Sequence, residues 1–162
     1  MLQHTQSVNR FFGTYASISC CLTRFNLYNA TVAESNLNHL LLNTCNQLQH
    51  LYLYHCDVGY LSIFKICDPN SKLISLEFST CVFEQVMLVC LRKLERFLCG
   101  YWGSTDAPLS LGYVACLKQV EIFNHTTHYQ RRFKLCELLC DTTSIETNIG
   151  FHWRKGNKHS FF

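Results

Sequence analysis

The sequence is poor in the residues that mark linkers, membrane spans and nucleic-acid surfaces. Its 162 residues include only two prolines and 15% charged residues, with a formal net charge of +3. No apolar run approaches the roughly 18–20 residues that a bilayer span needs, and MLQHTQSVNRFF has no basic patch followed by an apolar core. We therefore expect no Pro-rich linker, no membrane association, no secretory signal and no nucleic-acid partner.

Motifs of enzymes and metal centres are also missing. The chain has no nucleophile elbow, P-loop, dinucleotide-binding glycine pattern or HExxH, so we expect no enzyme. The best group of metal-ligating residue types has a spacing that matches no zinc pattern, and we expect no metal or other cofactor. That group is His125, His128, Cys136 and Cys140. A metal-binding or hydrolytic protein is the distant alternative.

Cysteine and hydrophobic residues are abundant. The 11 cysteines form an odd number without a secretory signal, which favours a reducing compartment, cytoplasmic or nuclear. The hydrophobic fraction of 48% is too high for a disordered chain. Basic residues gather near the C-terminus and are interpreted as a solvated face or tail, with contact to a nucleic acid or an anionic surface as the alternative. They are Arg131, Arg132, Lys134, Arg154, Lys155 and Lys158.

A repeat of the form L-x-x-L-x-L-x-x-C is the main positive feature. It is clearest from Leu48 to Cys56 and again from Leu73 to Cys81, an offset of 25 residues. This offset is typical of leucine-rich repeats. The same frame can be extended in both directions, and only His125 is clearly polar among its twenty positions. Its first positions are Leu22, Leu48, Leu73, Leu94 and Leu117, with spacings of 26, 25, 21 and 23.

A weaker sixth unit is expected near Ile145, although Asn148 stands where a leucine is wanted. The predicted organisation is therefore an irregular segment at 1–19, a repeat domain at 20–150 and a tail at 151–162. The second and third apolar positions of each unit are two residues apart, so in a strand they point to the same, inward face. One unit cannot bury that face alone, whereas stacked units share a core.

We therefore predict an α/β fold, a leucine-rich-repeat solenoid with a curved parallel sheet on its concave face. Short helices or extended segments would cover the convex face. Helices are expected at 35–44 and 131–140 and an extended segment at 83–90, whereas 60–66 fits either form. An ordinary α/β domain with similarly spaced strands is the alternative.

The segment LNTCNQLQHLYLYHCDVGYLSIFKICDPNSKLISLEFSTCVFE resembles the repeats of plant F-box/leucine-rich-repeat proteins, particularly a large grass-type group. FKLCELLCDTTSI resembles the segment that follows those repeats, and the resemblance covers roughly residues 20–150. It implies that the repeats capture a protein for ubiquitination, while an N-terminal F-box docks on a cullin–RING ligase through an adaptor. No F-box signature is found in residues 1–162, so the adaptor is expected as a partner only if a longer product carries one.

The side chains between the buried leucines should form the binding surface, since solenoids generally bind through the concave face. Equivalent side chains of neighbouring units would lie about 4.8 Å apart and form columns, with several tyrosines at one end. The predicted binding residues are Arg24, Asn26, Tyr28, His50, Tyr52, Tyr54, Glu77, Arg96, Glu121 and Phe123. A row of aromatics that merely covers the sheet is the alternative. The predicted function is a protein–protein interaction module, and its alternative is a degenerate or truncated repeat fragment without a specific partner.

Overall fold

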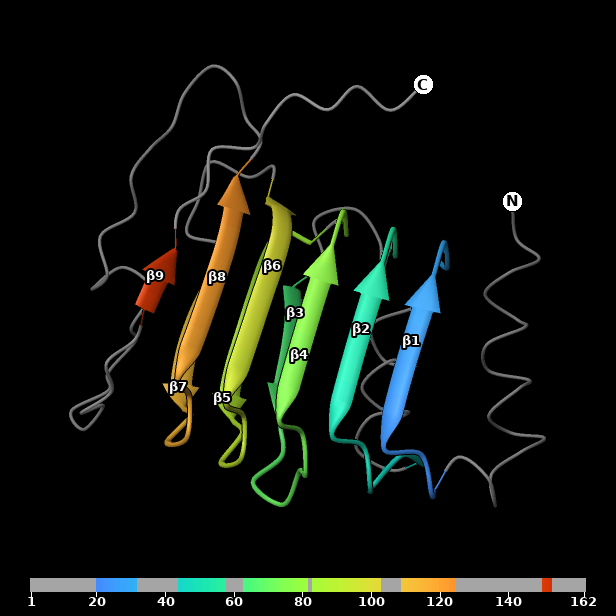
Figure 1. The fold of residues 1–162 in the computed structure, drawn as a ribbon, viewed down its shortest axis with the longest axis vertical. Coiled ribbons are helices and arrows are strands. Elements are labelled where there is room, and N and C mark those ends of the chain that lie inside the picture. The colour runs from blue at the N-terminus through green and yellow to red at the C-terminus, as the bar shows by residue number, and fades with distance from the viewer. Residues whose placement is uncertain are drawn as a thin grey trace.

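The computed structural model contains two sheets of parallel strands, between which the chain alternates (Figure 1). The structure describes residues 20–31, 44–57, 63–81, 83–102, 109–124 and 150–152. The larger sheet has six strands, in the order β1 (Arg24–Tyr28), β2 (His50–Tyr54), β4 (Ser75–Ser79), β6 (Arg96–Trp102), β8 (Gln119–Asn124) and β9 (Gly150–His152). The smaller sheet orders β3 (Ile63–Cys67), β5 (Gln85–Cys90) and β7 (Leu109–Tyr113). Because the chain alternates between the sheets, this part of it forms a β-solenoid.

The register of the large sheet confirms the repeat. Arg24 pairs with His50, His50 with Ser75, Ser75 with Arg96, and Arg96 with Gln119. Each of these residues lies two positions after a predicted start, so the five units stack in register and run parallel. β9 pairs Gly150 with Gln119. By this register Gly150 is equivalent to Gln119, while Ile145 and Asn148 of the expected sixth unit lie outside the described residues.

The convex face of the described solenoid, where the chain returns from one strand of the large sheet to the next, is a second sheet and not a layer of helices. In β3 the pattern alternates, with Phe64 and Ile66 buried and the residues on either side exposed, which is the two-residue period of a strand. The predicted α/β class is therefore wrong for the described residues, and of the two alternatives given for the convex face, short helices or extended segments, they show the second. The extended segment predicted at 83–90 is confirmed by β5, and 60–66, left open, contains β3.

Other helix predictions fall largely beyond the described residues. Residues 131–140 lie outside them, as do 35–43, whereas Thr44 at the end of the predicted helix is helical. β7 was not anticipated, and it extends the second sheet to three strands.

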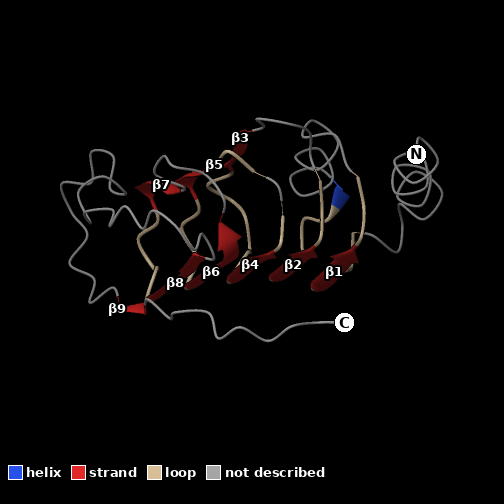
Figure 2. Ribbon diagram, turned by 90° about the horizontal axis from the view of Figure 1, so that it is seen from above, coloured by secondary structure: helices blue, strands red, loops and turns tan. Residues whose placement is uncertain are grey.

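The two sheets face each other (Figure 2), and the core between them is built by side chains from both. Phe78 of β4 is fully buried, and its ring lies 5.2 Å from Phe64 of β3, 4.9 Å from Phe83 and 5.8 Å from Phe97 of β6. Edge-to-face and tilted contacts at these distances are favourable beyond the area that they bury. These four rings join neighbouring turns of the solenoid, called coils here, as well as the two sheets.

The corners of the coils repeat as closely as the strands. Before three strands of the large sheet, the first frame residue donates its N–H to a carbonyl three residues earlier, as Leu48 does to Cys45 at 2.9 Å. After three strands the backbone bends through a residue with positive φ, at 50° in Asn29, 51° in His55 and 52° in Thr80. These three residues occupy the same frame position, so one turn geometry ends each of these strands.

Burial is less complete in the first coil than in the second. Phe25 and Leu27 of β1 are only partly buried, whereas the equivalent Leu51 and Leu53 of β2 are 1% and 0% exposed. β2 lies between β1 and β4, so coils stack on both sides of it. Full burial of a unit therefore depends on a neighbour on each side.

Candidate binding surface

The outer face of the six-stranded sheet, called here the open face, carries the side chains that alternate with the buried leucines. Three rows cross it because the strands are in register. The first row holds Arg24, His50, Ser75, Arg96 and Gln119; the second holds Asn26, Tyr52, Glu77, Leu98 and Glu121; the third begins with Tyr28, Tyr54 and Ser79. Neighbours in a row are one strand spacing apart, about 4.8 Å.

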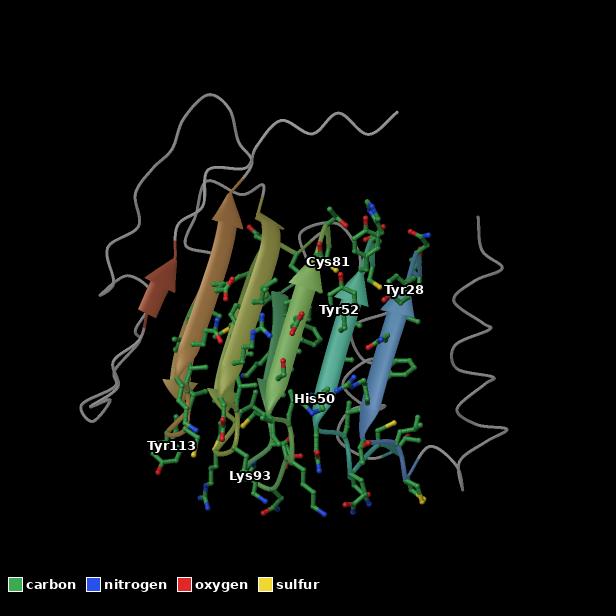
Figure 3. The ribbon with its side chains drawn as sticks, in the orientation of Figure 1. Tyr28, His50, Tyr52, Cys81, Lys93 and Tyr113 are labelled. Carbon is green, nitrogen blue, oxygen red and sulfur yellow. The ribbon has the colours of Figure 1, made fainter. Side chains whose placement is uncertain are left out.

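Three tyrosines from β1 and β2, Tyr28, Tyr52 and Tyr54, form a cluster on the open face. Tyr28 and Tyr52 are labelled in Figure 3. The Tyr28 ring lies 5.7 Å from that of Tyr52 and 5.8 Å from that of Tyr54. Tyr52 and Tyr54 are stacked at 6.3 Å with 18° between their planes. Tyr28 is 55% exposed. Desolvation, followed by the nearby Tyr28 hydroxyl, raises the pKa of Tyr52, so the Tyr52 hydroxyl stays protonated at neutral pH.

A shallow hollow of about 610 Å³ lies beside this tyrosine cluster and shares Tyr52 with it. Six of the ten predicted binding residues line the hollow: Arg24, Asn26, His50, Tyr52, Glu77 and Arg96. The remaining lining residues include Ile74, Glu95 and Lys118, which the sequence prediction missed. These three occupy the position directly after the first frame leucine, where each coil enters its strand.

Two ion pairs cross the β4–β8 half of the hollow. Arg96 Nη1 lies 3.5 Å from Glu77 Oε1, and Lys118 Nζ lies 2.9 Å from Glu95 Oε2. Glu77 also accepts a hydrogen bond from the Ser75 hydroxyl at 3.3 Å. These side chains are partly exposed, so each pair contributes at most about 1 kcal/mol to stability.

The predicted residues outside the hollow fall into two groups. Tyr28 and Tyr54 belong to the tyrosine cluster and touch the hollow through Tyr52. Glu121 lies in the second row and accepts a hydrogen bond from the Gln119 amide. The backbone of Phe123 is in β8, but its side chain lies outside the described residues.

The cysteine thiols that end two of the repeat units contact backbone carbonyls. Cys56 is 1% exposed, and its thiol lies 3.5 Å from the Leu27 carbonyl, while Cys81 donates to the Leu53 carbonyl at 3.3 Å. The hydrogen bond between these two thiols lowers the pKa of Cys56 to about 7 and raises that of Cys81. Both thiols thus satisfy carbonyls of the preceding coil.

No group of three or more metal-ligating side chains is found among the described residues, and the four residues considered in the sequence, His125, His128, Cys136 and Cys140, lie outside them. No helix in the described part is long and apolar enough to span a membrane. Comparison with protein-family models, with curated proteins and with solved structures finds no match to the chain.

Proposed function

We propose that the chain is a leucine-rich-repeat module that binds a segment of another protein on its open face. The observation that carries this proposal is the contact between the tyrosine cluster and the hollow. Together they give an aromatic surface beside charged and polar groups, all on one sheet face. Exposed tyrosine and arginine are the residue types most often found as anchors of protein interfaces. The chain would act by non-covalent capture, without catalysis of its own.

The leucine-rich-repeat assignment is supported by the sequence frame and by the position of its cysteines. The frame L-x-x-L-x-L-x-x-C places one strand per unit in a parallel sheet, and its last residue binds a carbonyl of the preceding coil, as Cys81 does. The resemblance to F-box repeats then suggests that the captured protein is a substrate for ubiquitination. Purification of the chain with cullin–RING adaptor components would test this link, and their persistent absence would remove it without affecting the binding proposal.

Selection from a random displayed peptide library tests the binding proposal directly. Peptides enriched on the immobilised protein should bind a Tyr28→Ser/Tyr54→Ser variant at least about tenfold more weakly, because two aromatic contacts are removed. Tyr113→Ser is the matched control, since Tyr113 lies on the second sheet and is 54% exposed against 55% for Tyr28. Failure to enrich any peptide, or equal losses in both variants, would contradict the proposal and favour a repeat fragment without a partner.

A further inference from the structure

We infer that the segment bound by the open face carries a carboxylate that is held by Arg24 and His50, and an apolar ring that lies on the tyrosine cluster. This inference rests on the proposed function and names the chemistry of its partner.

Charge is divided unequally between the two halves of the hollow. Its β4–β8 half contains the two carboxylates, Glu77 and Glu95, each within 4 Å of a cation. Its β1–β2 half contains Arg24 and His50 and no carboxylate among the lining residues. Arg24 is exposed and has no ion-pair partner within the described residues.

A free guanidinium beside a histidine can bind a carboxylate through two parallel N–H···O bonds. A cationic group of the partner would instead meet Arg24 without compensation, because the two glutamates are already paired. Charge complementarity therefore selects an acidic segment over a basic one.

The tyrosine cluster provides a surface for stacking and not a cage. A flat group inserted between two parallel rings needs about 7 Å between them, twice the usual contact distance of about 3.5 Å. Tyr52 and Tyr54 are already 6.3 Å apart between centroids, and Tyr28 closes one side of the pair. A partner must therefore lie across the rings, as a proline or an aromatic side chain does.

The spacing of the two anchors sets the spacing of their targets. Arg24 and Tyr28 begin and end β1, four residues apart on the same face. Four steps of about 3.3 Å give roughly 13 Å. An extended peptide that runs along β1 and β2 would place its acidic and ring-bearing residues about three to five positions apart.

The same displayed library tests this inference when it is selected on the wild-type protein. We expect enriched peptides to share an Asp or Glu three to five positions from a Pro, Phe, Tyr or Trp. The affinity of a selected synthetic peptide should fall at least about tenfold when its acidic residue is replaced by the amide, and should weaken as salt rises. That measurement needs no change in the protein.

Variants of the protein provide the complementary measurement. Arg24→Glu should weaken the same peptide at least about tenfold, whereas Lys65→Glu, an equal charge change at an exposed position of β3, should change its affinity less than twofold. Circular dichroism of both variants should match that of the wild type, because both side chains are exposed.

Two results would overturn the inference, and only the second would also overturn the proposed function. Peptides that bind the tyrosine cluster but show no acidic preference and ignore Arg24→Glu would overturn this inference and leave the proposed function intact. Absence of any enriched peptide would overturn both.

Discussion

Replacement of Leu53 by alanine should destabilise the protein much more than the same replacement of Leu27. The two leucines occupy the same frame position in neighbouring coils and pair with each other in the sheet register. Leu53 is 0% exposed, whereas Leu27 in the first coil is only partly buried. The comparison holds the residue type, strand position and facing direction constant, and changes only how completely the coils on either side enclose the side chain.

The expected magnitudes follow from burial. Removing the buried Leu53 side chain beyond its β-carbon loses the transfer free energy of three carbons, about 2.4 kcal/mol, and leaves a cavity that raises the loss to about 3–4 kcal/mol. Leu27 starts with part of its surface in water, so its loss should be about 1–2 kcal/mol. The difference, about 2 kcal/mol, is a large fraction of the stability of an ordinary domain.

Urea unfolding followed by circular dichroism measures both losses. If Leu53→Ala leaves too little folded protein, Leu53→Val, which removes one methylene, should cost about 1 kcal/mol and keeps the comparison possible. Equal losses at the two positions, or a loss below about 1 kcal/mol for Leu53→Ala, would refute the stacked-coil explanation of burial. A non-cooperative wild-type transition would instead support the alternative of a degenerate fragment.

Three further predictions concern the backbone and a buried thiol. Thr80→Asn should stabilise the protein by about 1 kcal/mol in thermal unfolding, because a β-branched residue is strained at φ 52° and asparagine is not; a loss would show that the hydrogen bond from the Thr80 hydroxyl to the Ser79 carbonyl, at 2.7 Å, matters more. Gly112→Ala should cost about 2 kcal/mol or more, since the added carbon would overlap the Val89 carbonyl oxygen; an unchanged melting temperature would contradict this close approach of β5 and β7. Burial raises the pKa of Cys99 to about 12 from an unfolded value of 9.0, so the unfolded chain loses this proton first. Cys99 should then contribute a loss of about 1.4 kcal/mol of stability per pH unit between pH 9 and 12, and Cys99→Ala should reduce the measured slope by that amount, leaving the part contributed by groups such as Cys45, whose pKa burial also raises.

The large sheet could be predicted from the sequence because its signal is repeated. The leucines at 48, 51 and 53 return at 73, 76 and 78 with the same spacing, and each repetition strengthens the assignment of register. The second sheet lacked such a signal. Its segments have different lengths and sequences, and the apolar residues of 60–66 fit a helical period as well as a strand. β7 was missed because it follows a stretch without any frame leucine.

The strand residues that line the hollow could be predicted from the sequence, whereas those just before the strands could not. Arg24, His50 and Tyr52 were predicted because outward positions alternate with buried leucines. Glu95 and Lys118 were not, because they directly follow a frame leucine and lie outside that alternation. Their ion pair at 2.9 Å joins equivalent positions of neighbouring coils, so a comparison of that one position between units would have shown two opposite charges.

The identical corners at Asn29, His55 and Thr80 have a consequence for how such a chain can change in length. Because β1, β2 and β4 end in the same bend, removal of residues 48–72 would bring the coil that begins at Leu22 next to the coil that begins at Leu73. The register of the sheet and the bend after each of these strands would be kept. A duplication of the same 25 residues would lengthen the molecule in the same way, so the gene can gain or lose whole coils as units.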